Sequence, residues 1–581
     1  MDFIKIALIG AIAVTVYYLL LQWPPVATSG DSSFISEVKE IDTIPHSNSI
    51  INDSKDSLSV LELSPSQSSD LTVGVSEVDS SFSKLFYLSN DVLNIGVDSL
   101  TGRFVSAEME GVRSEKDSVE LVSMFGNRLV SEAGEDCPQN LGALMLNSKC
   151  VGNYFASSGF YSVSDGYLNP NFSYLEEVDL DGGIKLYILS GQEGGLSFTK
   201  KILFRPGEYT LSVEDIVGLR EGIVSPKKIT PYARVLRDGA GVGPGGTRFD
   251  NFTYLGPIFS TQNDTFNKKK FKDLSSRPFE EVSLGGWLAL VQRYFVSAWV
   301  PQQDKTYKFQ ARQISSGAYS IALTGQDSIL SVGEPASFQN KLYVGPKLTE
   351  QLNKTHPDLG LVVDYGFLWW LGQPIHKLMS WGYALLGNWG LAILFATLVL
   401  KAILWPLSAA GYRSAAKMRA AAPKIQELQQ QYGSDKQKFG QEMMALYKKE
   451  GTSPLGGCLP MLLQMPFFLA FYWVLLDMVE LRHAPFLFWI TDLSSRDPLF
   501  ILPVINAALM YYSQKFMPTT PSNDPTQQQM QAMMKYMPLM IAVMFAFFPS
   551  GFVLYFTVQS FITLVQQALS FRREGVSLKS V

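Results

Sequence analysis

Histidine is scarce in this sequence, and its absence from one long region excludes a class of enzymes. Four histidines occur among the 581 residues, at His46, His356, His376 and His483. None falls between residues 82 and 346, so a hydrolase or sugar isomerase that used histidine as its acid or base has no candidate there. The acidic doublet Glu176 and Glu177 remains, but such doublets are usually solvated turns. We therefore expect no enzymatic activity, no cofactor and no metal site.

Cysteine is scarce as well. The chain has three cysteines, and two of them, Cys137 and Cys150, fall within residues 82–346. They bound a loop of about fourteen residues, and a disulfide across it in an oxidising compartment would contribute ~3 kcal/mol. Two free thiols are the alternative.

The chain has no excess of positive charge. Its formal net charge is −5 at pH 7, which argues against a general nucleic-acid binder. Residues 28–81 are rich in Ser and Asp and contain only Lys39 and Lys55 as cations. Such a segment cannot bury enough apolar surface to offset its chain entropy, so we expect a disordered tether there.

Long apolar runs are abundant, and the most informative is GLAILFATLVLKAILWP, Gly390 to Pro406. It is long enough for the main part of a membrane-spanning helix. Its one cation, Lys401, would cost ~2.5–3.5 kcal/mol at the centre of a bilayer. One interpretation is that Lys401 snorkels along Trp405 to the interface. The other is that Lys401 faces a wet cavity in a helix bundle, with Thr397 and Trp405 one turn either side on the same helix face.

The apolar runs together predict six transmembrane helices. Their expected positions are residues 1–23, 388–407, 454–476, 499–513, 535–548 and 551–570. The other expected parts are a linker (24–81), an all-β sandwich (82–346), a connecting and amphipathic interfacial helix (347–387), a helical hairpin (408–453), two loops (477–498 and 514–534) and a tail (571–581).

Two of these parts rest on specific signals. Short β-branched and aromatic runs that alternate with Gly, Asn, Asp and Pro predict the antiparallel sandwich. The first apolar run has roughly twenty residues and ends in Trp23-Pro24-Pro25, so we expect an uncleaved anchor, with a cleaved signal peptide as the alternative.

The hairpin at 408–453 sets the expected orientation. It carries eight cations and four acids, and a positive excess is typical of cytoplasmic segments. The all-β region would then lie on the other side of the membrane, with both chain termini in the cytoplasm.

Two kinds of residue stripe mark the predicted spans. Apolar stripes at three- and four-residue spacing are Met461, Met465, Phe468 and Tyr472 on one span and Met537, Met540 and Met544 on another. A polar stripe on the last span consists of Tyr555, Gln559, Thr563 and Gln566. Methionine stripes indicate either ordinary packing or an adaptable face for many apolar partners. Polar stripes point into a bundle or a wet groove, because lipid gives them no partner.

Several longer motifs resemble those of the YidC-type membrane protein insertases. In the last third they are KIQELQQQYGSDKQKFGQEMMALYKKEGTSPLGGCLPMLLQMPFFLAFY (424–472), PTTPSNDPTQQQM (518–530) and FPSGFVLYF (548–556). In the middle they are GGWLALVQRYFVSAWVP (285–301), LYVGPKL (342–348) and LVVDYGFLWWLGQPIHKLM (361–379). The resemblance covers about residues 82–570 and is densest after residue 360.

This resemblance implies a polytopic α-helical protein of the Gram-negative inner membrane, with a large periplasmic β-supersandwich and a cytoplasmic helical hairpin. It implies that the protein inserts nascent membrane proteins and helps them fold, alone or with the Sec translocon and its accessory subunits. It also implies a hydrophilic groove that is open to cytoplasm and lipid, closed to the periplasm, and holds one cation.

Two positions depart from the family pattern. The groove cation is usually arginine, and the matching residue here is Lys401. Lysine can lose its proton where it is desolvated, so the charge of the groove would depend on water. The tail FRREGVSLKSV is short, whereas long basic tails in the family act at the ribosome, so we expect at most weak ribosome binding.

These features lead to a hypothesis that needs neither ATP nor covalent chemistry. An apolar client segment slides along the apolar stripes beside the lipid bilayer, while its polar flank is solvated in the groove. The expected groove residues are Lys401, Thr397, Gln464, Gln559, Thr563 and Tyr555. A secondary transporter with Lys401 as its ion or substrate site is the alternative, although no two halves have matching hydropathy. A membrane-tethered glycan-binding module would leave the stripes unexplained.

Overall fold

The structure is a computed structural model that describes residues 85–574 with internal gaps. The gaps are residues 114–120, 132–143, 147–148, 163, 169, 221–226, 239–253, 315–317, 433–434, 450–458 and 517–535. The predicted anchor (1–23), the linker (24–81) and residues 575–581 of the predicted tail lie outside the described residues.

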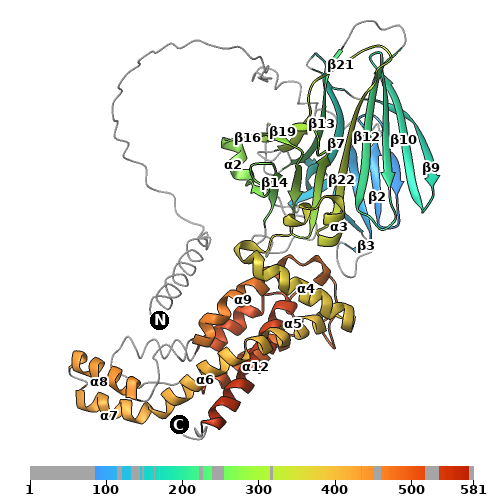
Figure 1. The fold of residues 1–581 in the computed structure, drawn as a ribbon. Helices are drawn as coiled ribbons and strands as arrows, with labels where there is room; N and C mark the ends of the chain where they lie inside the picture. Colours follow the sequence, from blue (N-terminus) through green and yellow to red (C-terminus); the bar gives the residue numbers. More distant parts are fainter. Residues whose placement is uncertain are drawn as a thin grey trace, which may run out of the picture. The chain divides into compact units, whose positions relative to one another are not determined.

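Two antiparallel sheets form the region from Leu85 to Pro346, here called the β-domain (Figure 1). The main path of the first sheet is β1 (Leu85–Ser89), β2 (Leu93–Asp98), β3 (Phe104–Arg113), β7 (Lys149–Ser162), β13 (Lys227–Asp238), β20 (Ala318–Thr324), β19 (Thr306–Gln313) and β16 (Phe279–Leu284). Short strands added to it are β4 (Leu121–Ser123), β5 (Gly126–Ser131), β6 (Leu144–Leu146), β8 (Gly166–Tyr167) and β21 (Ser328–Leu330).

The second sheet packs against the first across a shared apolar core. Its order is β15 (Asn267–Lys268), β14 (Gly256–Ser260), β17 (Trp287–Val291), β18 (Phe295–Pro301), β22 (Ala336–Pro346), β12 (Thr210–Leu219), β11 (Leu196–Phe204), β10 (Ile184–Glu193) and β9 (Phe172–Leu180). Trp299 is fully buried between the sheets, and its indole Nε1 donates to the Arg234 carbonyl of the first sheet at 3.0 Å. The expectation of an all-β region is confirmed.

Alternation of side chains explains how each strand finds its core face. Along β11 every second residue is buried, because successive side chains of a strand point to opposite faces. Lys200 falls on the buried face of this strand, where its Nζ lies 2.5 Å from Asp215 of β12. Ser158 of β7 donates to the same carboxylate and accepts from Lys200. The sandwich therefore encloses an ion pair within its apolar core.

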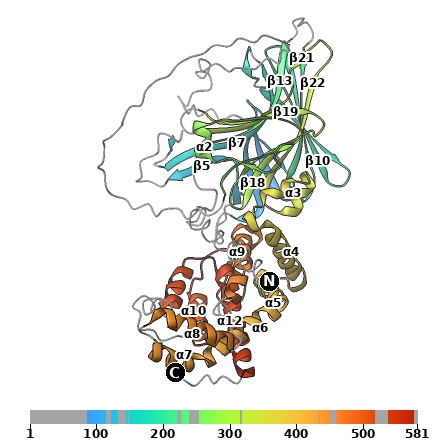
Figure 2. The same ribbon diagram turned by 60° about the vertical axis from the view of Figure 1, so that its left-hand side comes forward.

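A helical region follows β22, as expected (Figure 2). Its longer helices are α3 (Thr349–Thr355), α4 (Trp369–Leu386), α5 (Trp389–Ile403), α6 (Trp405–Ala420), α7 (Ala422–Tyr432), α8 (Lys436–Lys449), α9 (Leu459–Asp477), α10 (Ile501–Gln514), a helix at Tyr536–Phe545, and α12 (Ser550–Arg573). Shorter helical turns are α2 (Phe271–Ser276) in the β-domain and η5 (Leu359–Val362), η6 (Gly366–Leu368) and η7 (Val479–Leu481).

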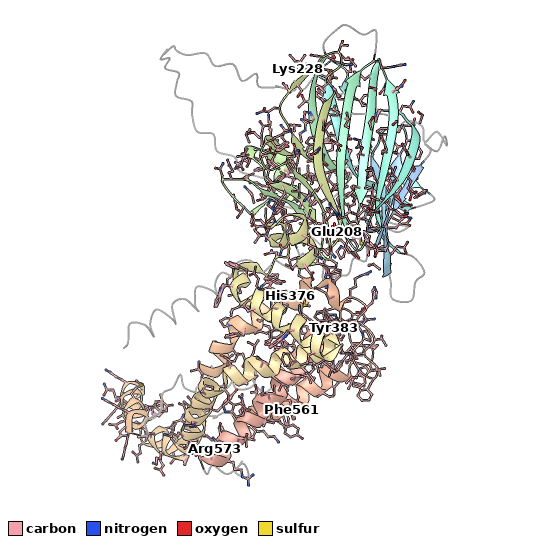
Figure 3. The ribbon with its side chains drawn as sticks, turned by 45° about the vertical axis from the view of Figure 1, so that its right-hand side comes forward. Glu208, Lys228, His376, Tyr383, Phe561 and Arg573 are labelled. Carbon is pink, nitrogen blue, oxygen red and sulfur yellow. The ribbon has the colours of Figure 1, made fainter. Side chains whose placement is uncertain are left out.

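Helix α4 presents apolar residues on both sides. Ile375 and Met379 are buried against neighbouring helices, whereas Trp369, Trp370 and Trp381 are more than half exposed. Figure 3 shows His376 and Tyr383 along this helix. The helix ends at Gly387, whose backbone is left-handed, a conformation that glycine adopts without strain. The position of this helix at a membrane interface stays a prediction.

The segment with Lys401 differs from the single helix that we predicted. Helix α5 ends at Ile403, and α6 continues from Trp405 at an angle of 67°. Pro406 explains the break, because a proline lacks the N–H for the helical bond and its ring clashes with the preceding turn. Trp405 therefore belongs to α6, and the prediction that it shares a helix face with Lys401 is wrong.

Helices α7 and α8 form the expected antiparallel pair around a small apolar cluster. Met418, Ile425 and Tyr447 are its buried members. The turn is capped by Asp435, whose carboxylate accepts from the backbone N–H groups of Gln437 and Lys438 at 3.1 and 3.0 Å.

By length and hydropathy, α12 is the one described helix that could cross a bilayer unaided, and α5 with α6 meets the same criterion as a bent pair. Helix Tyr536–Phe545 and the Gln464–Asp477 part of α9 are apolar but shorter. The number of spans stays a prediction.

Candidate functional site

Lys401 lies where three helices meet. Helix α5 places it, starting from Asn388, whose side chain accepts from the N–H of Leu391 and so caps the first turn. The Lys401 side chain is 4% exposed. Its Nζ donates to Gln464 Oε1 of α9 at 3.2 Å and to Thr563 Oγ1 of α12 at 3.1 Å. We call these three residues the Lys401 cluster.

Within the described residues, the Lys401 ammonium is stabilised by the dipoles of two neutral side chains, those of Gln464 and Thr563. Among the residues that the structure describes, Lys401 forms no ion pair, and both of its acceptors are neutral oxygens. Burying an ammonium group in this way costs several kcal/mol of hydration that two neutral hydrogen bonds do not return. Stability alone therefore does not explain this lysine, and an ionisable residue inside a membrane bundle usually marks a functional site.

The other predicted groove residues have other partners or no printed bond to this cluster among the described residues. Thr397 is buried, and its hydroxyl donates to the Ile393 carbonyl of its own helix at 2.7 Å. Tyr555 is buried and stacks on Phe471, with ring centroids 4.3 Å apart. Gln559 is half-buried. Lys401, Gln464 and Thr563 are thus the three predicted residues that the fold brings into direct contact.

Sequence reasoning missed a second polar face of α12. Asn506 Nδ2 of α10 donates to Ser560 Oγ at 3.1 Å, and Ser513 Oγ donates to Gln567 Oε1 at 2.6 Å. The seven-residue interval shared by the two pairs was the available signal.

The predicted apolar stripes differ in their exposure. Met540 and Met544 are 57% and 46% exposed. Their neighbours Leu539, Val543 and Phe547 are exposed to a similar degree. We call these five residues the exposed methionine face. Met465 and Met537 are half-buried.

The aromatic members of the other stripe pack inward instead. Phe468 contacts the rings of Phe552 and Phe556, and Tyr472 contacts Phe552, so both belong to an aromatic cluster with α12. The side chain of Met461 lies outside what the structure describes.

Of the two predicted disulfide partners, the structure describes the backbone of Cys150. The backbone of Cys150 lies in β7, paired with Ser131 and Met145, while its side chain and all of Cys137 lie outside the described part. Within the described residues, no group of three or more His, Cys, Asp and Glu side chains is arranged to hold a metal ion.

Comparisons with known proteins match nearly the whole chain. A family model described as YidC periplasmic domain matches residues 143–378, and one described as 60Kd inner membrane protein matches residues 381–575. The membrane protein insertase YidC of Azotobacter vinelandii is 37% identical over 98% of this chain and 98% of its own length. Those of Ectopseudomonas mendocina and Pseudomonas entomophila are 35% and 34% identical, each over 98% of this chain and 97% of the relative.

Proposed function

The chain belongs to the YidC family of membrane protein insertases, and from this premise we propose how its residues insert a client. Proteins of this family act on nascent membrane proteins in the bacterial inner membrane and carry a periplasmic domain, which here is the β-domain. Because the matched relatives are insertases, they do not favour the alternative of a secondary transporter.

The Lys401 cluster is the observation that supports the proposal most strongly. A polar flank that crosses the membrane needs partners that replace water, and an ammonium with two side-chain oxygens supplies both donors and acceptors. We take the cluster as the floor of a hydrophilic groove, with Gln559 further along α12. A flank that carries carboxylates gains most, because its charge meets a cation of opposite sign in a poorly solvated site.

The exposed methionine face would contact the apolar segment of the client, while the groove holds its polar flank. Methionine side chains are unbranched and adapt to many shapes, so they accept unlike apolar segments at similar energy. An apolar client segment that moves from this face into lipid exchanges one apolar environment for another. The step therefore requires neither ATP nor a covalent intermediate.

The orientation and partners follow from charge and family. The positive excess of α6 to α8 supports a cytoplasmic position for these helices and for both chain termini. An even number of spans is required for that orientation, and the apolar runs of the sequence supply six. The family resemblance suggests action alone or beside the Sec translocon.

Photocrosslinking of stalled nascent chains tests the route. With a crosslinkable residue at Met540 or Met544, we expect the apolar segment of an inserting client to be captured several times more often than at Val504. Val504 of α10 is the matched control, because it is 65% exposed and lies outside the exposed methionine face. Equal capture at the three positions would indicate general exposure to lipid and would contradict the slide.

Thiol labelling tests the predicted disulfide between Cys137 and Cys150. In cells with a permeabilised outer membrane, a membrane-impermeant thiol reagent should label neither cysteine until a reductant is added, because the periplasm is oxidising. Labelling before reduction would show two free thiols.

A further inference from the structure

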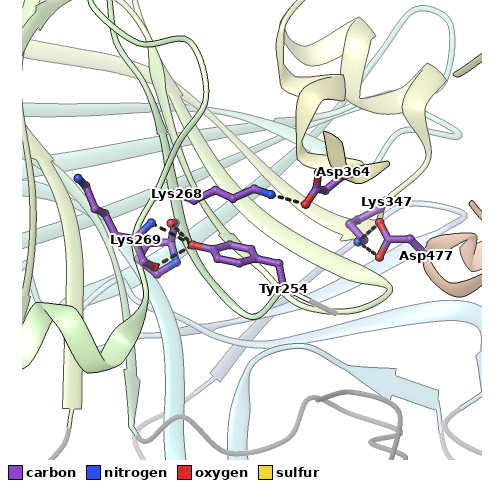
Figure 4. Close-up of polar contacts among 8 residues, drawn as sticks. Tyr254, Lys268, Lys269, Lys347, Asp364 and Asp477 are labelled. Atoms are coloured by element: carbon purple, nitrogen blue, oxygen red, sulfur yellow. Dashed lines mark hydrogen bonds and ion pairs between the residues drawn. The ribbon is translucent and has the colours of Figure 1, made fainter. Parts of the chain in front are cut away.

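A buried ion pair joins the β-domain to the outer end of α9 (Figure 4). Lys347 follows β22 directly, and its Nζ lies 2.6 Å from both carboxylate oxygens of Asp477, the last residue of α9. The side chains are 2% and 9% exposed. The pair therefore spans two parts of the fold that are far apart in sequence, and water is largely excluded from it.

Neighbouring contacts hold the same end of the helix. Arg293 Nε donates to the carbonyl of Leu476 at 3.4 Å, and the backbone N–H of Lys347 donates to the Tyr294 carbonyl at 2.9 Å. A cavity of about 20 Å³, large enough for about one water, lies between Lys347, Asp477 and Trp473. Lys268 and Asp364 form a second, more exposed ion pair beside it.

The other end of α9 carries the Lys401 cluster. Gln464 lies on the same helix as Asp477, about 20 Å away at ~1.5 Å per residue. Pro466 lies between them, and a proline inside a helix removes one backbone hydrogen bond and permits bending. Because Pro466 is only two residues from Gln464, the helix from Pro466 to Asp477 is continuous, and a rotation or shift of the outer end would be carried to the segment next to Gln464.

We infer that Lys347 and Asp477 are positioning residues for insertion: they fix the outer part of α9 on the periplasmic domain and thereby set Gln464 against Lys401. A buried ion pair contributes little net stability compared with apolar residues of the same size, but separating the two charges is costly. Rotation or sliding of α9 would separate them. The inference rests on the proposed function of the Lys401 cluster and gives the periplasmic domain a part in it.

The test compares three versions of the full-length protein in membranes. The first is the unaltered chain, the second is Lys347→Met/Asp477→Leu, and the third is the control Lys185→Met/Glu177→Gln. Lys185 and Glu177 form an exposed ion pair in the same domain, with side chains 37% and 46% exposed, so its loss should have no effect. The apolar double replacement leaves no unpaired buried charge, which separates positioning from folding.

Two readouts decide the outcome. In a Cys458→Ser background, a disulfide between Gln464→Cys and Thr563→Cys should form at least threefold less in the apolar double variant than in the control. Insertion of a client with an acidic flank, measured with Gln464 and Thr563 intact, should fall about fivefold at equal protein level. If either the disulfide yield or the insertion matches the control, the pair is only structural and the inference is overturned.

A Lys401→Met variant in the same assay separates this inference from the proposed function. Normal insertion by that variant would remove the role of Lys401 itself. Impaired insertion by Lys401→Met, together with normal insertion by the apolar double variant, would overturn only the positioning role of Lys347 and Asp477.

Discussion

Replacing Lys401 with methionine should reduce insertion of a client with an acidic translocated flank about tenfold, which corresponds to about 1.4 kcal/mol. Methionine keeps the length of the side chain and removes the charge. A contact between unit charges 4 Å apart is worth about 1 kcal/mol in water and about 4 kcal/mol in a partly desolvated site, so a tenfold effect lies within that range. A client with a neutral short flank should lose less than about twofold, because it makes no ion contact with Lys401.

Lys401→Arg is the matched control for this experiment. Arginine supplies a cation and further donors for Gln464 and Thr563, so insertion of both clients should stay close to the unaltered protein. Both variants need comparable levels in the membrane, and insertion is read as protection of the translocated flank from added protease. Normal insertion of the acidic client by the methionine variant would show that Lys401 only snorkels to the interface.

Removing Asp215 should cost the β-domain about 3–5 kcal/mol of its free energy of unfolding. Asp215→Ala leaves the Lys200 ammonium buried beside Ser158 with no carboxylate, and Lys200 is only 2% exposed. The variant Lys200→Met/Asp215→Leu removes both charges and should recover at least about half of that loss. Urea unfolding of the purified full-length protein, followed by pulse proteolysis of the β-domain, measures the difference.

The exposed pair in the same domain provides the comparison. Glu177→Ala disrupts its contact with Lys185 on the surface, where water solvates both groups, so we expect a loss below about 1 kcal/mol. If the apolar double variant lost as much stability as Asp215→Ala, the loss would come from packing around residue 215 and not from a stranded charge.

The local sequence pattern was sufficient to predict which regions form strands and which form helices. It was also sufficient to predict the polar residues of the Lys401 cluster. Alternation at period two and turn residues predicted the β-domain, and the polar stripe at three- and four-residue spacing predicted Thr563 as inward-facing. Gln464 was a candidate because it is a lone polar residue in an apolar run. A cation within an apolar run is improbable unless it has a use, which singled out Lys401 from composition alone. The sequence also contained the cause of the break after Ile403, because Pro406 lacks the backbone N–H for a helical hydrogen bond and its ring clashes with the preceding turn.

Only the tertiary structure decided which neighbours those faces meet. Tyr555 and Thr563 belong to one stripe, yet at ~100° per residue they differ by ~80° around α12, so Tyr555 stacks on Phe471 while Thr563 meets Lys401. Phe468 and Tyr472 turned inward because the aromatic residues of α12 lie opposite them, which no spacing within α9 could reveal. The contact of Lys347 with Asp477 joins residues 130 positions apart. Sequence sets the face that each helix or strand presents, and long-range packing sets the partner of that face.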